Sequence, residues 1–253
     1  MKTQINEKRV LVTGGAGFIG SNFLNAFVPR YENYRVINVD ALTYAGHLGN
    51  ITVSEKDNYV FEKADIRDIA ELERIFEKYK PTDVIHLAAE THVDFSIIRP
   101  SLFVQTNVIG TNNLLVLAHE HHIRRFLHVS TDEVYGSLQE GEEPFTTASP
   151  IRPNSPYSAS KAGSDMLVRA YHKTFGLDTV ITRCSNNFGP NQDLSKFIPK
   201  VINNLLENKK IPIYADGLNL RDWIYVSDHV EALDLVFHKG LSGEIYNIGG
   251  NSQ

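Results

Sequence analysis

Short apolar stretches of strand length alternate along the chain with longer segments in which apolar residues recur at helical spacing. Several of the short stretches are apolar at nearly every position, as in residues 84–89, Val-Ile-His-Leu-Ala-Ala. This pattern is typical of strands that are buried on both faces, in a parallel sheet between two layers of helices. The expected strands are Arg9–Thr13, Arg35–Asp40, Tyr59–Ala64, Asp83–Ala89, Arg124–Ser130 and Thr179–Arg183.

The segments between these strands predict helices. Asp68 suits an N-cap, and Pro100 and Pro156 suit the first turn of a helix. Strands that alternate with helices predict an α/β fold, a doubly wound parallel sheet of the Rossmann type. The expected helices are Phe18–Val28, Asp68–Tyr79, Pro100–His121 and Pro156–Phe175.

The rhythm of the chain changes after Asn186, where a turn-like stretch precedes shorter elements. We therefore expect a first domain over residues 1–185 and a smaller lobe over residues 186–253, partly interleaved with the first domain. The elements expected in this lobe are a helix near Lys196–Glu207, a strand at Ile211–Tyr214, a strand around Trp223–Val226 and a helix from Asp228 to His238.

Composition narrows the class of protein. The chain has 253 residues, 42% of them hydrophobic, and 25 basic against 30 acidic residues, for a net charge of −5. Basic residues do not cluster, so nucleic acid is not an expected partner. No apolar run approaches the roughly 18 residues of a membrane span, and no signal peptide is visible.

With Cys184 as the only cysteine, we expect a cytoplasmic protein. His119–His122 is better explained as a helix terminus than as a metal site.

A glycine-rich turn follows the first strand, at Gly14-Gly-Ala-Gly-Phe-Ile-Gly20. Glycines there allow a tight turn and a close approach of the backbone to a pyrophosphate, which the helix N-terminus also favours. Asp40 ends the second strand, where a carboxylate can bind both ribose hydroxyls and would repel a 2′-phosphate. The pattern predicts an NAD site formed by Gly14, Gly17, Phe18, Ile19, Gly20 and Asp40, with Asp65 and Ile66 on the adenine side and Leu87, Ala88 and Ala89 beside the diphosphate.

Tyr157 and Lys161 are four residues apart at the start of an expected helix, so they share one face. A nearby ammonium favours the phenolate and should lower the pKa of Tyr157. Such a tyrosine can remove a proton from an alcohol during hydride transfer.

Asp132 and Glu133 follow Thr131 at the end of the fifth strand, where ligands bind in sheets of this type. Neighbouring carboxylates can supply an acid and a base, as the elimination of water requires. In an extended chain they would point to opposite faces, so the backbone must turn if both are to reach one ligand.

These motifs resemble the extended short-chain dehydrogenases/reductases, in the NAD-dependent epimerase/dehydratase family. The Asp132–Glu133 pair favours a dehydratase over related epimerases, which generally lack both carboxylates, and decarboxylases, which carry only the second. The matching segments are 13–20, 40–46, 87–94, 131–136 and Tyr157-x-x-x-Lys161, and with 183–190 and 219–223 the resemblance narrows to the dTDP-glucose 4,6-dehydratases.

The resemblance implies a lyase that converts dTDP-glucose to dTDP-4-keto-6-deoxyglucose and water. Tyr157, helped by Lys161 and Thr131, would remove the C4 hydroxyl proton while hydride passes to NAD. Glu133 would then take the C5 proton, and Asp132 would protonate the departing C6 hydroxyl. Hydride would return to C6, so NAD would stay tightly bound.

The resemblance also implies binding residues and a homodimer formed through the Pro100–His121 and Pro156–Phe175 segments. Arg221 would bind the diphosphate through its guanidinium group. The alternative interpretation of Arg221 is a surface salt bridge with Asp222. Further NAD contacts would be Ala41, Leu42, Thr43, Thr91, Thr106, Tyr157, Lys161 and Asn187. The sugar nucleotide would contact Thr91, Thr131, Asn186, Lys196, Phe197, Pro212, Ile213, Tyr214 and Arg221.

The chain departs from the family pattern at Phe95, where arginine is usual, and at Asn191 and Ala215. Family members continue for several tens of residues beyond the position of Gln253. We therefore expect an apparently incomplete substrate lobe, in a fragment or a shortened homologue. The alternatives are another sugar-nucleotide dehydratase or 4-epimerase, and an NAD-binding protein with an incomplete, inactive substrate site.

Overall fold

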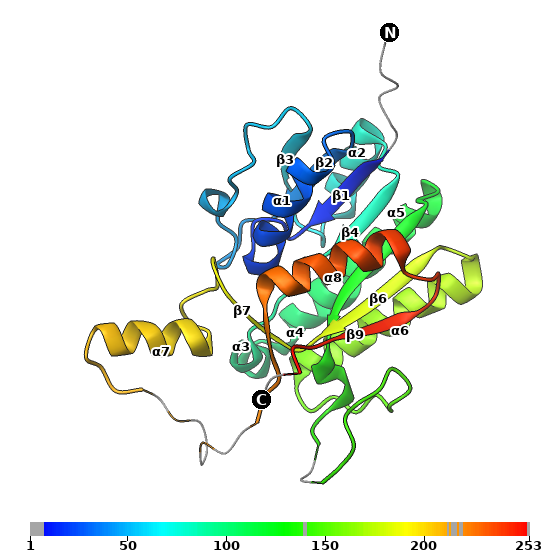
Figure 1. Cartoon of the computed structure of the whole chain (residues 1–253). Helices are drawn as coiled ribbons and strands as arrows, with labels where there is room; N and C mark the ends of the chain where they lie inside the picture. Colours follow the sequence, from blue (N-terminus) through cyan, green and yellow to red (C-terminus); the bar gives the residue numbers. More distant parts are fainter. Residues whose placement is uncertain (1–7, 139–140, 212, 214–216, 218–219, 252–253) are drawn as a thin grey trace.

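The computed structural model describes residues 8–138, 141–211, 213, 217 and 220–251. In this part of the chain one sheet holds seven parallel strands in the order β3-β2-β1-β4-β5-β6-β9 (Figure 1). The strand order reverses between β1 and β4, which makes this the point where ligands bind in open α/β sheets. The doubly wound parallel sheet is confirmed. Its strands are β1 (Arg9–Thr13), β2 (Arg35–Asp40), β3 (Tyr59–Lys63), β4 (Asp83–His86), β5 (Arg125–Thr131), β6 (Thr179–Cys184) and β9 (Ile245–Ile248).

Alternate residues of β1 enter two separate apolar layers. Val10 and Val12 pack beneath the helices α1 and α8, whereas Leu11 packs beneath α2 and α5. Both faces of the sheet are therefore dry, which explains why its strands are apolar without alternation. The helices of the two layers are α1 (Phe18–Arg30) and α8 (Val226–Lys239) on one face, and α2 (Ile69–Tyr79), α5 (Thr111–Glu120) and α6 (Pro156–Phe175) on the other (Figure 1).

The expected helix ends have clear local causes. The Asp68 side chain accepts a hydrogen bond from the backbone N–H of Glu71 and caps α2. Ser155 forms a capping box with Ser158 at the start of α6, with Pro156 in the first turn. Gly176 ends α6 in the left-handed region, at φ 71°. Helix α6 thus has the bounds that the sequence predicts.

The long helix expected from Pro100 to His121 is not uniform. It consists of α4 (Pro100–Phe103), a π-helical stretch (Val104–Gly110) and α5. The wider turn directs the Asn107 side chain to the backbone of Glu90, where it accepts from N–H at 2.8 Å and donates to C=O at 3.0 Å. Strand β4 ends at His86 and not at the expected Ala89; beyond it, the Ala88 N–H donates to the Thr13 hydroxyl at 3.3 Å. A short helix, α3 (Val93–Ile98), follows and was not expected.

The chain beyond Cys184 forms a small second sheet and then returns to the first. Strand β7 (Asn186–Phe188) pairs with β8 (Trp223–Tyr225), and α7 (Phe197–Leu206) lies between them in the sequence. Strand β9 then pairs with β6 at the edge of the main sheet. At the expected strand Ile211–Tyr214, Ile211 and Ile213 are irregular, and Pro212 and Tyr214 lie outside the described residues. The division of the chain at residue 185 stays a prediction.

Among the described residues, no helix is both long and apolar enough to cross a membrane.

Candidate active site

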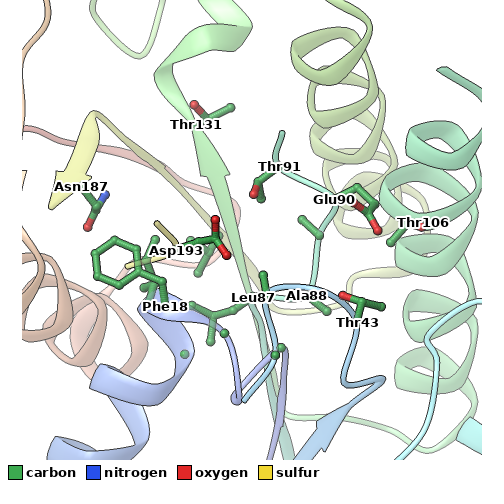
Figure 2. A pocket seen from close by; sticks show the side chains of 18 of the residues that line it. Phe18, Thr43, Leu87, Ala88, Glu90, Thr91, Thr106, Thr131, Asn187 and Asp193 are labelled. Atoms are coloured by element: carbon green, nitrogen blue, oxygen red, sulfur yellow. The ribbon is translucent and has the colours of Figure 1, made fainter. Parts of the chain in front are cut away.

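A pocket lies where the strand order reverses, at the carboxyl ends of the central strands. Its walls come from the β1–α1 turn, the ends of β2, β4, β5 and β6, and the start of α6. Figure 2 shows Phe18, Leu87 and Thr131 projecting from three of these elements around one space. Segments that are far apart in sequence thus meet at a single site.

The glycine turn has two different structural requirements. Gly14 has φ 74°, and a Cβ there would lie 2.6 Å from Cα of Ala88. A Cβ on Gly20 would lie 2.1 Å from the Gly14 carbonyl oxygen. Gly14 therefore lets the turn pack against the residues that follow β4, and Gly20 lets α1 pack against the turn itself. Gly17 faces more open space, since a Cβ there would meet only the Gly14 oxygen, at 3.3 Å.

The N-terminus of α1 is open to an anionic group. Its N-cap is Gly17, which has no side chain to cap the helix, and the first turn carries no acidic residue. The first backbone N–H groups of the helix therefore point to the pocket with a favourable helix dipole. This arrangement fits the diphosphate of a dinucleotide.

Asp40 braces the glycine turn. Its Oδ2 accepts a hydrogen bond from the Ala16 N–H at 2.9 Å, and its Oδ1 accepts from the Leu42 N–H at 2.8 Å. Each carboxylate oxygen has a second lone pair, so the group can still accept ribose hydroxyls. Asp40 lines the pocket but Leu42, which was expected to contact the cofactor, does not. Leu42 has φ 53°, and its contribution is the backbone N–H that orients Asp40.

We expect Asp40→Asn to weaken NAD binding by about tenfold and to lower the free energy of unfolding by about 1–3 kcal/mol. An asparagine amide would turn a donor toward one of two backbone N–H groups that need an acceptor. Calorimetric titration with NAD and thermal unfolding check the two effects. Asp57→Asn, the same change on an exposed aspartate, should alter neither. Unchanged NAD affinity in Asp40→Asn would contradict the assignment.

The far end of the pocket contains an ion pair. Asp65 and Arg67 both line it, and Nε of Arg67 donates to Asp65 at 3.0 Å. This hydrogen bond lowers the pKa of Asp65. Arg67 was missed in the sequence, although it directly follows the expected Asp65–Ile66 pair at the end of β3. The expected residues Ala41, Thr43, Ile66, Ala89 and Thr106 line the pocket with Phe18, Ile19, Leu87 and Ala88.

Tyr157 and Lys161 line the opposite end of the pocket, on the first turns of α6. Nζ of Lys161 donates to the Val129 carbonyl at 2.9 Å, and burial lowers the pKa of Lys161 to about 8. Burial also raises the pKa of Tyr157 well above its usual range, and the charge of Glu133 adds to this effect. The expected lowering of the Tyr157 pKa is therefore wrong, because burial is the largest influence on this phenol and raises its pKa.

The two consecutive carboxylates lie on a short 3₁₀ turn, Asp132–Tyr135. The Thr131 hydroxyl accepts from the Glu133 N–H at 3.2 Å and donates to Asp132 Oδ1 at 3.3 Å. The backbone therefore turns at Asp132 and Glu133, as both side chains need if they are to reach one ligand. Glu133 lines the pocket with Thr131, whereas Asp132 is half-buried beside it.

The two carboxylates have different surroundings. Burial, and next the charge of Glu133, raises the pKa of Asp132 to about 6. Burial also raises the pKa of Glu133, but the charges of Arg221 and Lys196 oppose that rise. Asp132 can therefore hold a proton close to neutral pH, while two cations favour the ionised form of Glu133. This is the arrangement that a paired acid and base need.

Residues beyond Cys184 also line the pocket. Lys196 donates from Nζ to the Thr91 carbonyl at 3.0 Å, which joins the segment before α7 to the segment between β4 and α3. Arg221 does not line the pocket, although its charge opposes the rise in the pKa of both carboxylates. Ile213 is 75% exposed and lies outside the lining, and the expected contacts Pro212 and Tyr214 lie outside the described residues. The other expected lobe residues, Asn186, Asn187 and Phe197, line the pocket with Thr91.

Several lining residues were not expected as contacts, although some of them lie in segments that carry the family resemblance. Asp193 points into the pocket in Figure 2, in a segment whose Asn191 side chain donates to the Ser21 hydroxyl at 3.1 Å. That segment therefore lies over the start of α1. Phe95, at the family's usual arginine position, packs edge-on against Tyr44 with ring centroids 6.2 Å apart. The lining residues missed include Tyr44, Gly46, Arg67, Ser185, Gln192, Asp193 and Trp223.

Comparisons with known proteins agree with this geometry. Residues 10–249 match the model of the NAD dependent epimerase/dehydratase family. The dTDP-glucose 4,6-dehydratase of Neisseria meningitidis serogroup B is 50% identical, over 97% of this chain and 72% of that protein. The dTDP-glucose 4,6-dehydratase of Bacillus anthracis, solved in complex with NAD, has a TM-score of 0.89 at 49% identity, over 97% of this chain and 76% of the other.

An epimerase structure is also similar, at lower identity. The UDP-glucose 4-epimerase of Thermotoga maritima, solved with UDP-glucose, has a TM-score of 0.86 at 33% identity, over 95% of this chain and 76% of the other. The fold is therefore shared between dehydratases and epimerases, and the sequence stands nearer to these dehydratases. With a family model that spans nearly all its residues, the chain belongs to the NAD dependent epimerase/dehydratase family.

Proposed function

We propose that the protein is an NAD-dependent dTDP-glucose 4,6-dehydratase, a lyase that forms dTDP-4-keto-6-deoxyglucose and water. The observation that carries this proposal is the Asp132–Glu133 pair, turned by Thr131 beside Tyr157 at the end of a dinucleotide pocket. An epimerase has no need of a second acid and base for the loss of water. The identity of 46–50% to dTDP-glucose 4,6-dehydratases supports the same substrate.

The residues present fit NAD. The open N-terminus of α1 suits the diphosphate, and Asp40 suits an unphosphorylated ribose. NAD, when bound, supplies a hydride acceptor and donor and the positive charge of its oxidised ring. Tyr157 and Lys161 lie at the end of the pocket remote from Asp65, where an alcohol proton can be removed.

The chain's own groups account for the proton movements. Tyr157 takes the proton from the C4 hydroxyl, and the Thr131 side chain opposes the rise in the Tyr157 pKa, which favours the phenolate. Once C4 is a ketone, the neighbouring C5 proton is acidic enough for a carboxylate to remove. Glu133, facing the pocket, takes that proton, and Asp132 donates its own proton to the C6 hydroxyl as water leaves.

Incubation of the purified protein with dTDP-glucose, followed by NMR, tests the proposal. We expect the signals of a 4-keto-6-deoxy sugar, with UDP- and CDP-glucose run in parallel to define the base. A C4-inverted product without loss of the C6 hydroxyl would identify an epimerase. Bound NAD with no change in any of the sugars would identify a binding protein and overturn the proposal.

The pH dependence of kcat/KM should report the Asp132 proton. Because the pKa of Asp132 is raised to about 6, its acid form is lost as the pH rises through about 6. We therefore expect kcat/KM to fall above that pH, and Asp132→Asn to remove this limb and to lower the rate by about 10²-fold. A full pH profile of both proteins is the measurement. A basic limb that persists in Asp132→Asn would assign it to another group.

A homodimer and a cytoplasmic location also belong to the proposal. Val104, Ile109 and Met166 are large apolar side chains that are 43–49% exposed on the π-helical stretch and α6, which supports an interface there. Light scattering after gel filtration should give twice the chain mass, and Ile109→Glu should reduce it. The one cysteine, Cys184, is a free thiol, as suits a reducing compartment.

A further inference from the structure

A buried ionic cluster lies behind the pocket. Arg183 on β6 donates from Nε to Asp165 Oδ2 on α6 at 2.9 Å, and from Nη1 to the Tyr135 hydroxyl at 2.8 Å. The Tyr135 hydroxyl in turn donates to Asn247 Oδ1 on β9 at 2.8 Å. Asp165 and Arg183 are 0% and 2% exposed. Burying a pair of charges costs free energy, because both lose their contact with water. Apolar residues of similar size often give a folded protein that is equally stable. The cluster therefore calls for a role besides packing.

Each member of the cluster adjoins an element that carries a proposed catalytic group. Asp165 lies one helical turn after Lys161 on the same face of α6. Tyr135 ends the 3₁₀ turn that holds Asp132 and Glu133. Arg183, through its contacts to both, joins the helix of the proposed base to the turn of the paired carboxylates.

The charge of the cluster acts on Lys161. Burial lowers the Lys161 pKa, and the Asp165 carboxylate is the largest influence that raises it, followed by Cys184. His86 and His128 also lie near Lys161, but burial lowers their pKa, that of His128 to about 4, so both are neutral at neutral pH.

Asp165 itself is faced by two ionisable groups. Arg183 is one, and His128 is the other, with Nε2 3.4 Å from Oδ1. The Arg183 charge partly cancels the charge of the Asp165 carboxylate. The effect of Asp165 on the Lys161 pKa therefore depends on Arg183.

We propose that Asp165 and Arg183 are positioning residues for the proposed dehydration: their ion pair sets the charge balance around Lys161 and, through Tyr135, anchors the turn that carries Asp132 and Glu133. This inference rests on the proposed function for its catalytic consequence. Its electrostatic part concerns Lys161 alone and can be measured without any turnover.

Two substitutions should move the titration of Lys161 in opposite directions. Asp165→Asn removes the favourable charge and leaves Arg183 uncompensated, so the Lys161 pKa should fall by about 1 unit. Arg183→Gln leaves the Asp165 charge uncompensated, so the Lys161 pKa should rise. The measurement is the ¹³Cε chemical shift of labelled lysine followed by NMR against pH, in the NAD-free protein. A loss of packing alone gives no such pair of opposite shifts.

The control is Thr182→Val. Thr182 is fully buried on the same strand as Arg183, and its side chain makes no hydrogen bond within the described residues. It should leave the Lys161 titration unchanged. Circular dichroism establishes whether each variant folds. One folded charge variant is enough for the test, because each has its own expected direction of the Lys161 pKa shift. Equal titrations in a folded charge variant and the parent protein would overturn the electrostatic part.

Tyr135→Phe tests the anchoring part. It keeps the ring, which stacks on Phe145 with centroids 5.1 Å apart, and removes only the hydroxyl between Arg183 and Asn247. We expect kcat to fall by about tenfold with KM and the Lys161 titration unchanged. An unchanged kcat would overturn the anchoring role of Tyr135.

The two proposals can fail separately. If the parent protein does not dehydrate dTDP-glucose, the proposed function fails, but the Lys161 titrations still test the electrostatic part.

Discussion

Glu133→Gln should oxidise dTDP-glucose at C4 but form 4-keto-6-deoxy product about 10³-fold more slowly than the parent protein. Glutamine keeps the size of the side chain in the pocket wall but cannot accept the C5 proton. Oxidation at C4 depends on Tyr157 and is left intact. The variant should therefore accumulate reduced nicotinamide, which absorbance detects, while NMR finds almost no deoxy sugar.

Hydrogen exchange makes this expectation sharper. In heavy water the parent protein should place deuterium at C5 of recovered or converted sugar, and Glu133→Gln should not. Glu143→Gln, the same chemical change at an exposed glutamate outside the pocket lining, should behave as the parent protein does. Normal product from Glu133→Gln would assign the C5 proton to another base.

Tyr157→Phe should stop the reaction one step earlier. The change removes only the phenolic oxygen from a ring that is 8% exposed and packs against Phe103 with centroids 6.3 Å apart. Without a group to take the C4 hydroxyl proton, the oxidation should slow by about 10³- to 10⁴-fold, while NAD stays bound. Rapid mixing with dTDP-glucose should then produce no burst of reduced nicotinamide, in contrast to Glu133→Gln.

A second tyrosine on the same helix provides the control. Tyr171 lies on α6 away from the pocket lining, so Tyr171→Phe should leave the burst and the rate unchanged. A normal burst in Tyr157→Phe would exclude this tyrosine as the base for the C4 proton. Together the two pairs of variants separate oxidation from elimination.

The sequence predicts most of the sheet because burial on both faces leaves a local signal. The bounds of β1, β2 and α6 match their expected ranges, and the pocket forms where the strand ends place it. The glycine turn, Asp40 and the Asp132–Glu133 turn were recognisable because each follows an expected strand. These segments meet because the carboxyl ends of parallel strands lie along the same edge of a sheet.

Other parts depend on contacts that no local pattern contains. Asn22 donates to the Pro190 carbonyl at 2.8 Å across most of the chain, and this contact helps bring Gln192 and Asp193 to the pocket. Asn107 on the π-helical stretch bonds to the backbone of Glu90, in the loop between β4 and α3. The pKa of Tyr157 depends on burial and on the charge of Glu133, which both raise it, and the spacing of Tyr157 and Lys161 does not reveal either influence.

The pairing of β9 with β6 has a consequence for synthesis on the ribosome. Every residue of β6 is buried in the finished sheet, yet its outer partner is translated about sixty residues later. Until Ile245–Ile248 has emerged, β6 is an edge strand of the nascent chain with unpaired backbone groups, which is a template for association with other chains. Ribosomes that stall between these two strands should therefore yield the products most dependent on chaperones, and slow translation of this interval should lower the yield of protein that stays in solution.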